Sequence, residues 1–209
     1  LSEAEVRAYL YGTLDDLADA RLMKGMTEAV ELLCQKIQAG ATIRIIGDYD
    51  IDGVNATHIL VTGLRRAGAR VDTVIPDRLK DGYGINEHLI EQAKEAGIDT
   101  IVTCDNGIAA AKEIAYAKEL GMTVIVTDHH EIPYREEPDG TRTMILPPAD
   151  VIVNPKQADC PYPYKKLCGA AVAWRLVEVL YQEAGVPREE FLRLAQFAAV
   201  ATIGDIMDL

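Results

Sequence analysis

The sequence lacks the features that mark membrane and secreted proteins. No apolar run reaches the roughly 18 residues that a membrane-spanning helix needs. The N-terminus, LSEAEVRAYL, is acidic and amphipathic and shows no signal-peptide pattern. These absences predict a protein of the cytoplasm with no membrane partner.

Cysteine is also scarce, and the four thiols form no CxxC pair. A structural zinc site favours paired thiolates, and a chain of 209 residues needs no disulfides to build a core. We therefore interpret the cysteines as reduced structural residues, and a partnership between Cys160 and Cys168 stays open.

Positive charge is in deficit, because 21 lysines and arginines face 33 aspartates and glutamates, for a net charge of −12. This balance argues against a domain that grips nucleic acid by bulk electrostatics alone. The argument weakens if several carboxylates are ligands of divalent cations, since bound cations would cancel part of the charge.

Apolar spacing and glycine positions predict that strands and helices alternate along the chain. Residues 3–40 have helical spacing, with Gly40 as the expected end. Residues 132–150 contain four prolines and an Asp139-Gly140 turn, so we expect a loop there. Strands are expected at 42–46, 71–75, 100–103, 122–127 and 151–153, and helices at 55–67, 86–96, 109–120, 169–184 and 188–203. The alternation predicts an α/β fold, a mostly parallel sheet flanked by helices on both faces, with helical N-terminal and C-terminal segments.

Acidic side chains and histidines follow three of the expected strands. Because the carboxyl ends of parallel strands share the edge at which ligands bind, we expect these side chains to meet. Crowded carboxylates repel one another, and two divalent cations would relieve that repulsion. Carboxylates with a few imidazoles suit Mn²⁺, Mg²⁺ or Fe²⁺, and one bridging carboxylate would hold two ions about 3.5–4 Å apart. The residues are Asp48, Asp50, Asp52, Asp105, Asp128, His129 and His130.

Each of these segments alone has a simpler interpretation. The Asp-x-Asp-x-Asp-Gly run at 48–53 resembles the start of a calcium loop, but Ile59 stands where that loop needs a glutamate. The Asp-Asn-Gly run at 105–107 is a common turn, and Asp128 could be a helix cap. Their joint occurrence at successive strand ends favours a metal site.

Together these segments resemble the motifs of the DHH phosphoesterase family, which is named for an Asp-His-His run such as 128–130. The resemblance covers residues from about 43 to 209 and is strongest to the family's exonucleases for single-stranded DNA. It implies a DHH catalytic domain at 41–209, preceded by a helical N-terminal extension at 1–40. The motifs are Gly47–Gly53, Asp105–Ile108, Asp128–His130 and Thr202–Asp205, supported by stretches at 81–84, 152–155 and 167–170.

The resemblance implies that aspartates hold two divalent cations, with Mn²⁺ expected and Mg²⁺ as the alternative. Asp50 and Asp52 would each hold one ion, Asp105 would bridge the two, and Asp48 would be an extra ligand or a partner of one. Some family members carry a histidine four residues before the position of Asp50, where Ile46 stands here. The shell of the ion at Asp50 would then be completed by water or by Asp48.

His129 and Asp205 would complete the coordination of the ion at Asp52. His130 would face the substrate phosphate, and Asp128 would orient His129, a common arrangement around metal-binding histidines. The implied reaction is in-line attack of an activated water on phosphorus, with no covalent enzyme intermediate.

Two basic residues, Arg78 and Lys80, follow the second expected strand and lie near the same edge of the sheet. They would either meet the charge of the substrate phosphate or be ordinary solvated loop charges. The sequence supports the two interpretations equally.

The implied activity is 5′ to 3′ hydrolysis of single-stranded DNA in repair and recombination, with a single-strand binding protein and a helicase as expected partners. A nanoRNA or cyclic-dinucleotide phosphodiesterase, or a pyrophosphatase, of the same family stays open. A non-catalytic platform should have lost ligands that are present here. The family usually continues into a second domain with a Gly-Gly-Gly-His motif, and these exonucleases carry an oligonucleotide-binding fold. Neither occurs in the 209 residues, so we expect part of a longer protein.

Overall fold

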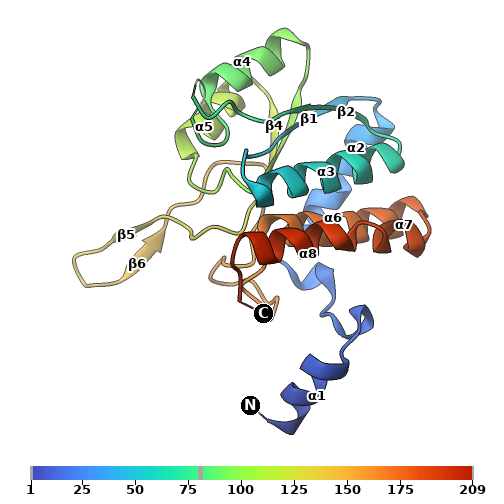
Figure 1. Ribbon diagram of the computed structural model, residues 1–209. Helices are drawn as coiled ribbons and strands as arrows, with labels where there is room; N and C mark the ends of the chain where they lie inside the picture. The colour runs from blue at the N-terminus through green and yellow to red at the C-terminus, as the bar shows by residue number, and fades with distance from the viewer. Residues whose placement is uncertain (1, 80–81, 209) are drawn as a thin grey trace.

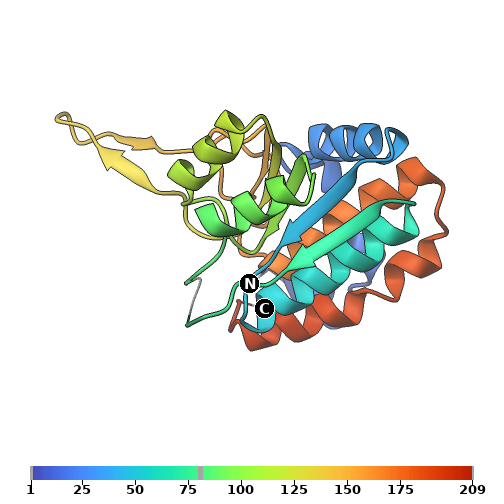
Figure 2. The same cartoon turned by 90° about the horizontal axis from the view of Figure 1, so that it is seen from above.

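The computed structural model describes residues 2–79 and 82–208, and a five-stranded sheet runs through its centre (Figure 1, Figure 2). All four strand pairings are parallel. The predicted α/β fold with a mostly parallel sheet is therefore confirmed. In spatial order the strands are β2 (Arg70–Val74), β1 (Thr42–Ile46), β3 (Thr100–Cys104), β4 (Thr123–Thr127) and β7 (Val151–Val153).

Two apolar cores, one on each face of the sheet, explain why helices cover both sides. Alternate residues of a strand point to opposite faces. Ile43 and Ile45 of β1 enter the larger core, whereas Ile101 and Val124 enter the smaller one. The larger core is covered by α2 (Met26–Gln38), α3 (Ile51–Arg66) and α6 (Gly169–Ala184), with α8 (Ala195–Gly204) packed on α3 and α6, and the smaller core by α4 (Glu87–Glu95) and α5 (Ala111–Glu119).

The N-terminal segment is helical, as expected, and its buried core residues begin at Ala20 in the turn that precedes the last helix. Buried Met26, Val30 and Leu33 of α2 lie in the same core as α3 and α6. In Figure 1, α1 lies apart from the layers. The expected domain boundary at residue 40 stays a prediction. Before α2 the chain forms α1 (Glu3–Tyr11) and two short 3₁₀ turns, η1 (Leu14–Asp16) and η2 (Ala20–Leu22).

The structure corrects the expected start of α3. The helix begins at Ile51 rather than at residue 55 because Asp50 is its N-cap. The Asp50 side chain accepts a hydrogen bond from the backbone N–H of Gly53 at 2.8 Å, which satisfies one of the free amides of the first turn. Asn86 caps α4 in the same way, where its side chain accepts the N–H of Leu89 at 3.0 Å.

Two segments of the C-terminal half also differ from expectation. The expected loop at 132–150 contains an antiparallel hairpin, β5 (Tyr134–Glu136) and β6 (Arg142–Met144), because the turn at Gly140 lets the chain fold back on itself. The expected helix at 188–203 is two helices, α7 (Arg188–Leu192) and α8. Hydrogen bonds that span only three residues tighten the chain where these two helices meet.

No helix in the described part of the chain combines the length and the apolar character needed to cross a membrane.

α3 packs closely against α6 at Gly63. A Cβ atom placed on this residue would lie 2.4 Å from Cγ2 of Val177 on α6, well inside van der Waals contact. Glycine therefore stands in mid-helix, despite its poor helix propensity, because the packing of α3 on α6 leaves no room for a methyl group.

We expect Gly63→Ala to lower the free energy of unfolding, as measured by urea denaturation. Overpacking typically costs about 1–3 kcal/mol, and the better helix propensity of alanine returns at most about 1 kcal/mol. Val177→Ala should relieve the clash, so the double variant should be less destabilised than the sum of the two single variants. Strictly additive effects would contradict this close contact.

Candidate metal centre

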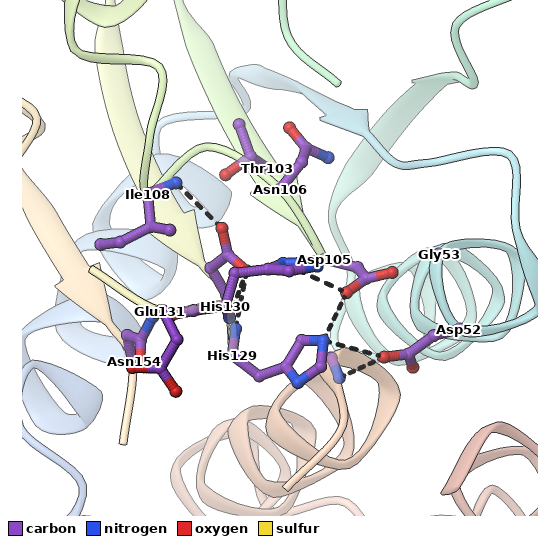
Figure 3. A network of polar contacts seen from close by, with 12 residues as sticks. Asp52, Gly53, Thr103, Asp105, Asn106, Ile108, His129, His130, Glu131 and Asn154 are labelled. Atoms are coloured by element: carbon purple, nitrogen blue, oxygen red, sulfur yellow. Dashed lines mark hydrogen bonds and ion pairs between the residues drawn. The ribbon is translucent and has the colours of Figure 1, made fainter. Parts of the chain in front are cut away.

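Four segments bring carboxylates and imidazoles to the carboxyl edge of the sheet. Three are the loops that follow β1, β3 and β4, and the fourth is the C-terminal end of α8. Figure 3 shows the middle of the group, where side chains from these loops point toward one another. The eight residues that the sequence analysis assigned to the centre therefore converge: Asp48, Asp50, Asp52, Asp105, Asp128, His129, His130 and Asp205.

One group of donor atoms surrounds the ring of His129. Its Nε2 atom lies 3.1 Å from Oδ1 of Asp105 and 3.5 Å from Oδ2 of Asp52. Oδ2 of Asp205, the C-cap residue of α8, lies 3.7 Å from the same nitrogen. Donor atoms of Asp52, His129 and Asp205 all lie within 4.8 Å of one another, which is close enough for one cation to contact all three.

The N-terminus of α6 holds Asp52 in place. The backbone N–H groups of Gly169 and Ala170 donate to its two carboxylate oxygens at 2.6 and 2.7 Å. The helix dipole and the free amides of a first turn both favour a negative charge at this position. This contact between segments 117 residues apart was not foreseen from the sequence.

A second group of donor atoms consists of Asp48, Asp50 and Asp105, again within 4.8 Å of one another. Asp105 lies near the donors of both groups, the position that a bridging ligand requires. Ile46 offers no donor atom, because its side chain is a hydrocarbon, and it is fully buried in the smaller apolar core. Among the described residues, the candidate donors at this second position are therefore the three aspartates.

Asp105 is the most constrained residue of the centre. It is buried and its φ is +61°, a left-handed conformation that few residues other than glycine adopt. Burial and the nearby charge of Asp52 hold the pKa of Asp105 well above the usual aspartate range. A Cβ on Gly169 would lie 2.6 Å from Oδ1 of Asp105, so a side chain at 169 would displace this carboxylate.

The donor set fits divalent cations. Both oxygens of Asp48 and Oδ1 of Asp105 are buried and make no hydrogen bond. The amides of Tyr49 and Gly84 lie close to Asp48 without meeting hydrogen-bond geometry, and burial raises the pKa of this carboxyl. Buried acceptors left without a partner cost about 1–3 kcal/mol each. Oxygen and imidazole donors arranged in this way suit Mn²⁺ or Mg²⁺.

Asp128 does not orient His129, contrary to expectation. Its Oδ1 lies 2.7 Å from Nδ1 of His130, and it also accepts the backbone N–H groups of both histidines. Its Oδ2 accepts the N–H of Ile108 at 2.9 Å. Burial opposes ionisation, but the hydrogen bonds from His130 outweigh it and hold the pKa of Asp128 below its usual value. The consecutive positions of the two histidines gave no sign of which ring would turn toward Asp128.

Sequence reasoning assigned no role to two residues that build the centre, Tyr83 and Asn106. Tyr83 donates from its hydroxyl to the carbonyl of Asp105 at 3.0 Å, and the same hydroxyl lies 3.4 Å from Nε2 of His130. Asn106 donates to the carbonyls of Ile46, Gly47 and Cys104, and thereby ties the end of β1 to the end of β3. Both residues lie in noted motifs, but only the fold shows their contacts.

Two basic residues, Arg78 and Lys80, were expected near this edge of the sheet. Arg78 is exposed, and its guanidinium carbon lies 5.5 Å from the centre of the Tyr49 ring, which in turn contacts Tyr83 edge-on. Arg78 therefore lies at the rim of the centre rather than among the donors. Lys80 lies outside the described residues, and its assignment to substrate binding stays a prediction.

We expect Asp105→Asn to stabilise the protein in the absence of metal. The pKa of this carboxyl is higher in the folded than in the unfolded state, where it is about 3.8. Its contribution to stability is therefore fully present below pH 3.8 and is lost as the pH rises toward the folded pKa. At neutral pH the amide removes that cost, so the midpoint of thermal unfolding should rise. Calorimetry in a chelating buffer measures it.

In Mn²⁺ the unsubstituted protein, rather than Asp105→Asn, should have the higher midpoint of thermal unfolding. A ligand that binds only the folded state raises its stability, and the variant lacks the carboxylate shared by both donor groups. Glu95→Gln removes one exposed charge on α4, far from the donors, and should respond to Mn²⁺ as the unsubstituted protein does. An equal response of Asp105→Asn and Glu95→Gln would exclude Asp105 as a ligand.

Comparison with known proteins agrees with the resemblance described for the sequence. The sequence model of the DHH family, N-terminal domain, matches residues 42–202. The chain is 43% identical over 203 residues to the single-stranded-DNA-specific exonuclease RecJ of Bacillus subtilis (strain 168), a match that covers 97% of this chain and 24% of that protein.

Two solved structures are similar in both sequence and fold. A crystal structure of exonuclease RecJ bound to manganese is 39% identical, with a TM-score of 0.75, over 88% of this chain and 44% of that one. RecJ of Thermus thermophilus, in complex with Mn²⁺, is 36% identical, with a TM-score of 0.70, over 88% of this chain and 24% of that one. The chain thus spans less than half the length of each of these relatives.

Proposed function

The chain belongs to the DHH family, and on that premise we propose that it is the catalytic core of a metal-dependent 5′ to 3′ exonuclease for single-stranded DNA. The observation that carries the proposal is the position of Asp105, which lies with Asp48 and Asp50 in one donor group and whose Oδ1 is 3.1 Å from Nε2 of His129 in the other. Two cations at such positions are the usual arrangement of enzymes that hydrolyse phosphodiesters. We propose Mn²⁺ as the principal cation, as described for the two solved relatives, with Mg²⁺ as the alternative.

The proposed ligands divide between the two positions. Asp52, His129 and Asp205 would hold one ion, Asp48 and Asp50 the other, and Asp105 both. When bound, the cations supply positive charge to the phosphoryl oxygens and lower the pKa of a water molecule. The buried carboxylates of Asp48 and Asp105 hold the negative charge that this arrangement needs, in a place from which bulk water is excluded.

The chain contributes a fixed imidazole, that of His130, on the substrate side of the centre. Asp128 holds its Nδ1 at 2.7 Å, and this contact raises the pKa of His130 above the usual histidine value. The ring therefore stays positively charged to higher pH and is half exposed. We propose that its Nε2, which lies beside the hydroxyl of Tyr83, donates to a phosphoryl oxygen of the substrate.

Tyr83 would fix the position of that imidazole. Its hydroxyl touches both the carbonyl of Asp105 and Nε2 of His130. Burial raises the pKa of Tyr83, so the phenol is protonated at neutral pH and donates its hydrogen bond. Substrate binding at His130 would then be coupled to the backbone of the shared metal ligand.

The net charge of −12 is the observation that favours a second candidate, a phosphodiesterase for nanoRNA or cyclic dinucleotides, or a pyrophosphatase. Small substrates need no extended basic surface, whereas a long strand gains much of its affinity from contacts to phosphate. The similarity to RecJ over 97% of the chain supports the exonuclease instead. Retention of all eight expected polar residues speaks against a non-catalytic platform.

Partners and location belong to the same proposal. A single-strand binding protein and a helicase would supply the single strand, and further domains of the longer relatives would add grip on it. With chromosomal DNA as its substrate, the activity would lie in the cytoplasm of a bacterium such as those that carry the relatives.

The decisive measurement is hydrolysis in Mn²⁺ of four substrates: a 5′-labelled single strand, its duplex, a dinucleotide and pyrophosphate. We expect mononucleotides from the single strand and little product from the duplex. In Asp105→Ala, kcat/KM should fall by more than the roughly 10–100-fold that is typical of residues supporting a metal site.

Asp99→Ala provides the matched control. Asp99 precedes β3 at the opposite edge of the sheet, where it pairs with Lys36, so its loss should leave the rate within about twofold of the unsubstituted protein. Turnover of the dinucleotide or of pyrophosphate alone would move the assignment to the small-substrate enzymes. No turnover together with no Mn²⁺ binding by calorimetry would refute the metal-dependent reaction itself.

A further inference from the structure

A hollow lined by lysines lies beside the candidate metal centre. Its volume is about 500 Å³. Three of the nine lysines of a strongly acidic chain meet there. We call it the lysine hollow, and its lining residues are Glu131, Lys156, Gln157, Ala158, Lys165 and Lys166.

One wall of the lysine hollow is tied to the centre through Asn154. Its Nδ2 donates to the carbonyl of His130 at 3.1 Å, and its Oδ1 accepts the N–H of Lys156 at 2.8 Å. Glu131 follows His130 directly, and Figure 3 shows Glu131 and Asn154 next to the histidines. A strand whose phosphate touches His130 would therefore meet this wall next.

The opposite wall leads to the other side of the centre. Lys165 and Lys166 lie in the loop that ends at Cys168, the N-cap of α6. The first amide of that helix, at Gly169, binds the carboxylate of Asp52. One wall of the lysine hollow thus directly follows His130 in the chain, and the other directly precedes the helix whose N-terminus binds Asp52.

The charges of these lysines are available to a ligand. Lys156 pairs with Glu131 at 2.9 Å, but the Glu131 side chain is 86% exposed, and Lys166 pairs with an exposed Asp208. The Lys166–Asp208 pair is exposed on both sides and contributes little stability, so a phosphate can replace Asp208 at low cost. In the Lys156–Glu131 pair the carboxylate is exposed, whereas the Lys156 side chain is 21% exposed. Lys165 donates to the carbonyl of Cys160, and no carboxylate pairs with it among the described residues.

We propose that the lysine hollow binds the phosphodiester backbone of the single strand whose cleaved bond lies at the metal centre. The inference rests on the proposed function and adds to it the place where neighbouring phosphates are held. Lysines act as point charges without sequence preference. Tyr164, 43% exposed and next to Lys165, adds a ring on which a base can stack, the usual companion of basic residues in single-strand binding.

If the lysine hollow binds neighbouring phosphates, the rate of hydrolysis should depend on the length of the DNA strand. A dinucleotide on the metal centre has no further phosphate for the lysine hollow, whereas a longer strand has several. Loss of the lysines should therefore raise KM for the longer strand and leave its kcat nearly constant, because they bind phosphates that do not react.

The test compares the unsubstituted chain with Lys165→Gln/Lys166→Gln, which removes two charges and keeps polar side chains. We expect affinity for a fluorescent oligo-dT of about twelve nucleotides, measured by anisotropy without metal at low salt, to fall about tenfold. The slope of log K against log salt should shrink by about 0.7 for each phosphate that the variant no longer neutralises. In Mn²⁺ the ratio of kcat/KM for this strand to that for a dinucleotide should fall about as much as the affinity.

Lys36→Gln is the control, since Lys36 is an ion-paired lysine at the opposite edge of the sheet. It should change neither affinity nor slope. Lys156→Gln, on the other wall, should reproduce part of the loss. No binding of oligo-dT by the unsubstituted chain, an unchanged salt slope in the double variant, or equal losses for both substrates would overturn the proposal. Binding that depends on the lysines but leads to no hydrolysis would refute the proposed function and leave the phosphate contact standing.

Discussion

Mutual repulsion among carboxylates confined to one edge of the sheet is the constraint on which this structure depends. Parallel strands end at a common edge, and this chain places an aspartate after each of β1, β3 and β4. Burial makes that crowding expensive, as the raised pKa values of Asp48 and Asp105 show. Bound cations from outside the chain would relieve this repulsion.

The carboxylates of the site fall into two sets, those that accept hydrogen bonds from the protein and those with buried oxygens that do not. Hydrogen bonds stabilise the charge of Asp52 at the start of α6, that of Asp50 in the first turn of α3, and that of Asp128 beside His130. Asp48 and Asp105 receive no such hydrogen bonds to their buried oxygens. The protein thus orients Asp50, Asp52 and Asp128 with its own hydrogen-bond donors, whereas the buried oxygens of Asp48 and Oδ1 of Asp105 have no hydrogen-bond partner.

Helix termini connect this electrostatic design to the packing of the core. α3 and α6 lie against each other with a glycine at their contact, and both begin at the edge where the carboxylates lie. The same packing that buries the larger core therefore aims two helix N-termini at the centre. Asp205 arrives from α8, which packs on the outside of these two helices. A change in the packing of these helices would consequently move the carboxylates of the centre.

The sequence by itself determined the alternation of strands and helices, the parallel sheet and the set of polar residues at its edge. These follow from local periodicity and from the order of segments, which are properties of the chain alone. Only the tertiary structure decided that Asp128 holds His130 rather than His129, that Tyr83 and Asn106 lock the loops, and that the side chains of three lysines line one hollow. Those contacts join residues far apart in the chain or depend on side-chain direction, and neither spacing nor propensity encodes them.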